Sequence, residues 1–91
     1  MKTLHWTLGN GSGLDGTARA MAEAENRLGI DARVCLAHNE ATWTDEILTD
    51  VDVHVCHVHF PDRVRSRLTR PPRVVWIGHG TPEYTLQTSM E

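Results

Sequence analysis

Three stretches of this sequence carry residue types that suit the binding of a small polar ligand. They are a glycine-rich run at residues 9–13, a His-x-His pair at His57 and His59, and a His-Gly-Thr run at residues 79–81. Glycine lets the backbone approach a phosphate closely, and imidazole exchanges protons near neutral pH. Each stretch follows a short apolar run that is typical of a β-strand. Because ligands of open parallel α/β sheets lie beyond the carboxyl ends of the strands, the three stretches predict one common site.

The order of apolar and helix-forming segments predicts strands that alternate with helices. We expect strands at residues 4–8, 32–37, 51–60 and 73–77, and helices at residues 14–28, 42–48 and 62–70. This alternation is typical of right-handed crossovers and a parallel sheet, for which we expect the strand order 2-1-3-4. The predicted fold class is therefore α/β, an open parallel Rossmann-like sheet with flanking helices, formed by residues 1–91 as part of a larger domain.

Local signals mark where the predicted helices begin and end. Gly29 stands where a helix end favours a residue of positive φ, and Thr42 or Thr44 is placed to cap the second helix. Asp62 is placed to cap the third helix, which the Pro71-Pro72 pair then stops. A further helix is expected to begin at Pro82, after the His-Gly-Thr run.

Composition narrows the classes of function. The formal net charge of −3 argues against a general nucleic-acid binder, because such proteins usually carry a basic surface. Arginines do gather between Arg63 and Arg73, either as a solvated face or as a surface that attracts anionic partners. Cys35 and Cys56 fall in apolar strands with no signal peptide before them, so we expect reduced thiols in a cytoplasmic protein. No apolar run approaches the roughly 18 residues of a membrane-spanning helix.

The glycine-rich run admits more than one interpretation. Residues 11–16 match the G-x-G-x-x-G pattern of dinucleotide-binding sites, between a strand and a helix as that pattern requires. The pattern also needs an acidic residue near the end of the second strand, where this chain has Leu36-Ala37-His38. A dinucleotide site and a plain tight turn both stay open as alternatives. A Walker A loop is excluded, because no Gly-Lys-Ser/Thr occurs.

The histidines also admit two interpretations. His57 and His59 fall on one face of an extended strand, from which both rings could reach a metal ion, with His79 or His5 as a third ligand. No carboxylate or cysteine falls at a matching place, so we predict no metal site. For His5 and His54 we favour burial with hydrogen bonds near the sheet edge. His59 and His79 are expected at the ligand-binding edge.

Taken together, the motifs resemble the N-terminal domain of GT-B glycosyltransferases. The likeness is to the retaining glycosyltransferase family 4, which includes glycogen synthases and mannosyltransferases. It rests on the glycine-rich loop, on residues 52–61 (DVHVCHVHFP) and on residues 74–81 (VVWIGHGT), which follow in the same order and at similar spacing. The resemblance covers nearly the whole chain.

The resemblance implies roles for the matching residues around the donor. Gly11, Ser12 and Gly13 would present backbone N–H groups to the diphosphate of a nucleotide-sugar. His79 would be the catalytic residue, close to the donor sugar and placed to stabilise the transition state.

On the acceptor side, the resemblance implies that His59, Gly80 and Thr81 line the sugar and its acceptor. It implies no cofactor and no metal, with the nucleotide-sugar as co-substrate.

The resemblance is incomplete in one respect. In that family a second, C-terminal Rossmann-like domain with a Glu-x7-Glu motif holds most of the donor nucleotide, and these 91 residues do not contain it. We therefore expect the acceptor-side half-domain of a longer glycosyltransferase, inactive alone. The alternative is a small non-catalytic α/β module that binds a phosphate-bearing ligand or a partner through its exposed edge strand.

Overall fold

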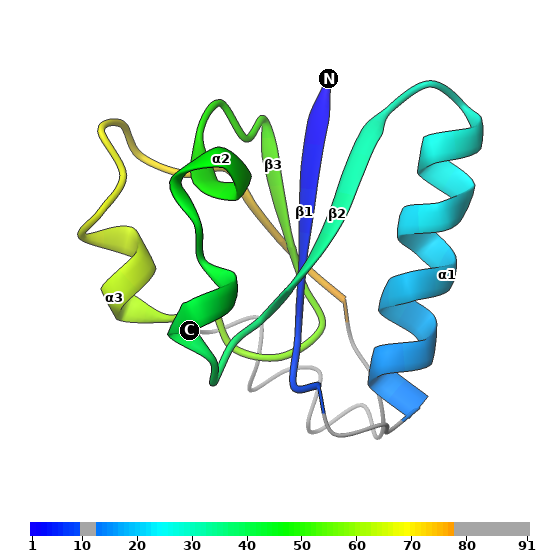
Figure 1. The fold of residues 1–91 in the computed structure, drawn as a ribbon, viewed down its shortest axis with the longest axis horizontal. Helices are drawn as coiled ribbons and strands as arrows, with labels where there is room; N and C mark the ends of the chain where they lie inside the picture. The colour runs from blue at the N-terminus through cyan, green and yellow to red at the C-terminus, as the bar shows by residue number, and fades with distance from the viewer. Residues whose placement is uncertain (10–12, 78–91) are drawn as a thin grey trace.

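A computed structural model describes residues 1–9 and 13–77, and they form a single parallel sheet flanked by helices (Figure 1). In these residues four strands pair in the order β2-β1-β3-β4. The strands are β1 (Lys2–Thr7), β2 (Asp31–Leu36), β3 (Val53–Cys56) and β4 (Val74–Trp76). The predicted α/β class and the strand order 2-1-3-4 are confirmed. The order reverses between β1 and β3, so the two central strands flank the position where such sheets bind ligands.

The connections between the strands carry the helices. They are α1 (Gly13–Arg27), the 3-10 helix η1 (Glu40–Thr42), α2 (Asp45–Leu48) and α3 (Asp62–Arg65). Figure 1 shows α1 along one face of the sheet, with α2 and α3 on the opposite side. The first helix runs antiparallel to the strands, so its N-terminus lies at the end of the sheet where β1 stops.

Two of the predicted helix signals are confirmed. Gly29 follows α1 with φ +88°, a conformation that glycine adopts without strain. Thr44 caps α2, and its hydroxyl oxygen accepts the N–H of Ile47 at 3.3 Å. The choice between Thr42 and Thr44 is thereby decided in favour of Thr44.

The predicted cap of the third helix is wrong. Asp62 is the first residue of α3 rather than its cap, and Pro61 occupies the capping position without a side-chain hydrogen bond. Proline suits the capping position because its fixed φ is compatible with the start of a helix. The Asp62 carboxylate lies in the first turn, where the helix dipole favours a negative charge. The helix also ends at Arg65, well before the Pro71-Pro72 pair.

The third strand is shorter than the predicted span of residues 51–60. It stops at Cys56, and the chain bends at His57 and Val58. Phe60 then turns back onto the core, where its ring meets that of Trp6 edge-on with centroids 5.8 Å apart. Burial of this large ring against another ring stabilises the bent path of the chain.

The two faces of the sheet differ in character, because successive side chains of β1 point to opposite sides. Leu4 and Trp6 belong to an apolar core under α2 and α3. Thr3, His5 and Thr7 are also buried, but on the face that α1 covers. On this second face the polar side chains lie among small apolar ones, including Ala18, Ala22 and Val55.

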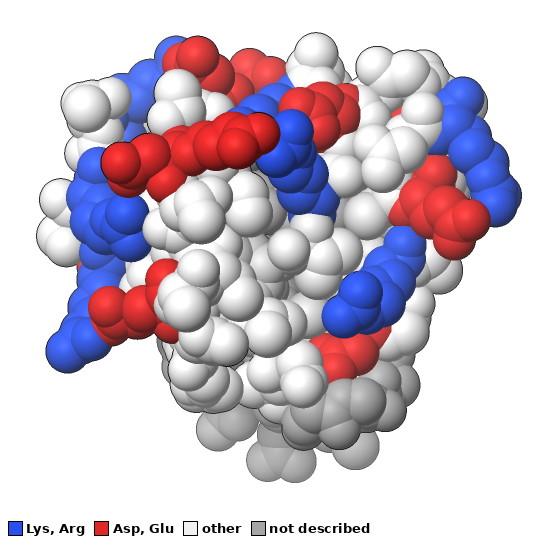
Figure 2. All heavy atoms as spheres, viewed as in Figure 1, with Lys and Arg blue, Asp and Glu red and all other residues white. Residues whose placement is uncertain are grey.

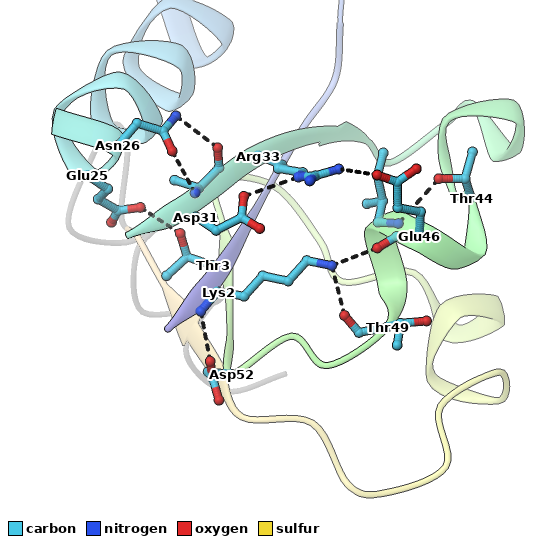
Figure 3. A network of polar contacts seen from close by, with 12 residues as sticks. Lys2, Thr3, Glu25, Asn26, Asp31, Arg33, Thr44, Glu46, Thr49 and Asp52 are labelled. Atoms are coloured by element: carbon cyan, nitrogen blue, oxygen red, sulfur yellow. Dashed lines mark hydrogen bonds and ion pairs between the residues drawn. The ribbon is translucent and has the colours of Figure 1, made fainter. Parts of the chain in front are cut away.

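A network of polar contacts fastens the amino-terminal edge of the sheet (Figure 3). The Lys2 ammonium donates to the backbone oxygens of Glu46 and Thr49, at 2.6 and 2.8 Å. The Asn26 side chain both donates to and accepts from the backbone of Ala32, which ties the end of α1 to β2. These contacts provide hydrogen-bond partners for backbone N–H and C=O groups that are not paired within the sheet.

Candidate ligand site at the carboxyl edge

The turn after β1 has the geometry that requires glycine. Gly9 has φ +80°, and a Cβ built there would lie 2.7 Å from a methyl carbon of Leu36. Its N–H donates to the Asp15 carboxylate at 2.9 Å, and the Thr7 hydroxyl donates to the same oxygen. One buried carboxylate in the first turn of α1 therefore holds the end of β1 and the start of the helix together.

Asp15 is a residue to which the sequence interpretation gave no role. It is only 5% exposed, although carboxylates are rarely buried unless they are paired or hydrogen-bonded. An acidic residue in the first turn of a helix, two residues after the glycine run, was the available signal, since carboxylates there accept free N–H groups.

Of the residues predicted to bind the diphosphate, Gly13 is the first residue of α1. Its N–H belongs to the first four of the helix, which have no partner within the helix and carry partial positive charge. Gly11 and Ser12 lie outside the described residues, and so do the predicted His79, Gly80 and Thr81.

His59 lies at the carboxyl edge, as expected. It is exposed, in the segment that follows β3, and its ring centroid is 4.9 Å from that of His38, which follows β2. The segments beyond the two strands that flank β1 thus bring two imidazoles together at the surface. The sequence interpretation noted His38 only as a residue that is not acidic.

The expectation that His57 and His59 share one strand face is wrong. Since β3 ends at Cys56, the regular alternation stops before either residue, and His57 is 2% exposed whereas His59 is exposed. His57 is engaged with His5, with 3.0 Å between its Nε2 and the Nδ1 of His5. Within residues 1–9 and 13–77, no three His, Cys, Asp or Glu side chains are grouped so that they could hold a metal ion.

A chain of hydrogen bonds runs beneath α1 from Glu25 through His5 to His57. The Glu25 carboxylate lies 2.7 Å from Nε2 of His5. An ionised carboxylate only accepts, so Nε2 of His5 carries a proton and donates to Glu25. The burial predicted for His5 is confirmed, and its partners were beyond the reach of the sequence pattern.

The ionisation of Glu25 determines which atom donates in its hydrogen bond with His5. Partial burial raises the pKa of the Glu25 carboxyl, but hydrogen bonds from His5 and Thr3 outweigh it and leave the pKa below its ordinary value. The carboxylate is therefore ionised at neutral pH. Since His5 is completely buried, losing this acceptor would leave a buried ring N–H without a partner.

The two cysteines take no part in the carboxyl edge. Cys35 and Cys56 are buried free thiols in the apolar core. Burial raises the pKa of Cys56 to about 12, against a small opposing effect of Arg65, and burial also raises the pKa of Cys35. Neither thiol forms the thiolate that nucleophilic or metal-binding chemistry needs.

Comparisons of the chain with models of known protein families, with curated proteins and with solved structures found no match. Among the described residues, no helix has both the length and the apolar character needed to span a membrane.

Proposed function

We propose that this chain binds the diphosphate of a nucleotide-sugar at the carboxyl edge of its sheet, as the acceptor-side half-domain of a retaining glycosyltransferase. The observation that carries the proposal is the junction of β1 and α1. A glycine turn leads from the central strand into a 15-residue helix whose first N–H groups face that edge. Such a junction attracts phosphate through unpaired N–H groups and through the helix dipole.

The chemistry of the Asp15 carboxylate is compatible with an anion nearby. Its negative charge would repel a diphosphate if it were directed to solvent. Instead the carboxylate is buried and accepts hydrogen bonds from Thr7 and Gly9. Its charge is thereby partly compensated, and it acts on the ligand by fixing the turn.

The residues after β3 support a role on the sugar side of the site. His59 lies exposed beside His38, with 4.9 Å between the ring centroids. Hydroxyl groups of a sugar or an acceptor both donate and accept, so an imidazole edge suits them. His79 stays the proposed catalytic residue, and transfer itself requires a second domain for the nucleotide.

Calorimetric titration with UDP-glucose and GDP-mannose tests the proposal through two glycine variants. Gly13→Val should weaken binding of the preferred nucleotide-sugar by at least about tenfold, because a side chain there keeps the diphosphate from the backbone. Gly16→Val is the matched control, since a Cβ at Gly16 would meet no atom within 4 Å. Equal affinities in the two variants, or no binding of any nucleotide-sugar by the wild type, would contradict the proposal.

The same titrations separate the proposal from the phosphate-binding module. If inorganic phosphate or ADP binds as tightly as every nucleotide-sugar, the sugar contributes nothing, and the module is the better description. In a protein that includes the second domain, His79→Ala should lower kcat by about a hundredfold with little change in donor affinity, because the lost hydrogen bond acts in the transition state.

A further inference from the structure

A hollow of about 230 Å3 lies at the amino-terminal edge of the sheet. One wall is the segment that joins α2 to β3, and the other is the segment that joins α3 to β4. Figure 1 shows both segments near the end of the sheet where the strands begin, opposite the end where β1 stops. The hollow is therefore separate from the proposed nucleotide-sugar site.

The hollow has an apolar side. Leu48, Val51 and Leu68 line it together with the Pro71-Pro72 pair. An apolar cavity of about 150 Å3 is large enough to take up benzene. A hollow of 230 Å3 therefore has room for one ring with a short substituent.

The charges around the hollow balance. Two arginines and two aspartates line it, and Arg67 pairs with Asp45 at 3.3 Å. Arg70 and Asp50 supply one further charge of each sign. Acidic and basic side chains are likewise interspersed over the face shown in Figure 2. The lining therefore gives no preference for a charged ligand.

His54 supplies a buried donor to this hollow. It is 2% exposed and lines the hollow, and its Nδ1 accepts the indole N–H of Trp6 at 3.0 Å. Burial lowers the pKa of His54 to about 4, so the ring is neutral at pH 7 and carries its proton on Nε2. Among the described residues no group accepts that proton. A buried N–H at the wall of a hollow calls for an acceptor beyond these described residues, which a bound ligand can supply.

We propose that this hollow binds a small neutral carbonyl compound, such as a ketone or an amide. The carbonyl oxygen accepts the Nε2–H of His54, and the apolar body of the ligand packs against Leu48 and Leu68. The proposal is independent of the function proposed for the carboxyl edge, because no residue is shared between the two sites.

Three probes of similar shape test each part of the proposal by NMR titration of the wild-type chain. Acetophenone carries the ring and the carbonyl, α-methylstyrene has a methylene group in place of the oxygen, and benzoate adds a charge. We expect acetophenone to shift the ring signals of His54 and to bind about fivefold more tightly than α-methylstyrene, the ratio that one net hydrogen bond gives. Benzoate should bind more weakly than acetophenone, because the lining has no excess positive charge.

His54→Phe removes the donor while it keeps a ring of similar size, and in this variant acetophenone and α-methylstyrene should bind alike. If this variant does not fold, the comparison of acetophenone with α-methylstyrene on the wild-type chain still tests the proposal. Equal binding of the two neutral probes to the wild type would overturn the proposal, since the hollow would then be merely apolar. Tighter binding of benzoate, or no shift of the His54 signals with acetophenone, would also overturn it.

Discussion

The two faces of the sheet are built from alternate residues of the same strand, yet they hold the molecule together in different ways. On the face under α2 and α3, Leu4 and Trp6 contact apolar and aromatic side chains. On the face under α1, Thr3 and His5 form hydrogen bonds with the carboxylate of Glu25. The first face is stabilised by removing apolar surface from water, and the second depends in addition on satisfying buried polar groups.

This difference indicates how each face should respond to substitution. Apolar burial has no direction, so the α2/α3 face tolerates changes of similar volume. The hydrogen bonds under α1 are directional, and they link Glu25, His5 and His57 from α1 across β1 to the segment after β3. Removing one donor or acceptor from this face leaves its buried partner unsatisfied, which costs free energy.

The largest expected effect is the removal of the aromatic centre of the apolar face. Trp6→Ala should lower the free energy of unfolding by about 3–5 kcal/mol, because Trp6 is completely buried and touches the rings of Trp43 and Phe60. Urea denaturation measures the change. Leu28→Ala is the control on a large side chain that is 79% exposed, and it should change stability by less than about 0.5 kcal/mol. Similar effects of the two substitutions would mean that Trp6 is not part of a packed core.

The apolar face should also make the protein sensitive to acid through His54. Burial lowers the pKa of His54 from 6.5 to about 4, so the unfolded chain binds this proton more readily than the folded chain. The stabilisation is complete above pH 6.5 and is lost as the pH falls toward 4, with a change of about 2–3 kcal/mol.

Denaturation curves between pH 7 and pH 4 measure this loss. In His54→Phe the loss over the same interval should be smaller by that amount, while the contributions of the other histidines remain. An identical pH dependence in the variant and the wild type would show that His54 protonates as readily in the folded chain as in the unfolded chain.

The polar face should respond less strongly to a single change. Glu25→Ala should lower the free energy of unfolding by about 1–2 kcal/mol, because it removes the acceptor of buried His5 and of Thr3. Glu23→Ala is the matched control two residues away, since Glu23 is exposed and pairs with exposed Arg27. It should change stability by less than about 0.5 kcal/mol. Equal effects of the two substitutions would contradict a buried hydrogen-bond chain.

Much of the fold could be predicted because its signals are local. Apolar runs mark the strands, Gly29 marks the end of α1, and crossover rules give the strand order. The length of β3 could not be predicted, because the bend after Cys56 depends on the contact of Phe60 with distant Trp6. The contact between His5 and His57 spans 52 residues and leaves no periodic trace.

The candidate site could be predicted less fully than the fold. His59 lies exposed after the end of β3, as topology alone predicts, and its role at a sugar site stays a prediction. The role of Asp15 depends on the three-dimensional path of the turn, and the donor at His54 depends on which ring nitrogen faces Trp6. The catalytic role of His79 stays a prediction.

The central claim is that the carboxyl edge binds a nucleotide-sugar, and mapping the bound ligand onto backbone amides tests it most directly. In a 15N NMR titration with UDP-glucose and GDP-mannose, we predict that the shifts of at least one ligand concentrate at Gly9, at the first turn of α1 and at residues 57–59. Shifts confined to residues 45–51 and 67–72, around the amino-terminal hollow, would contradict the claim. The absence of any shift with either nucleotide-sugar would contradict it as well.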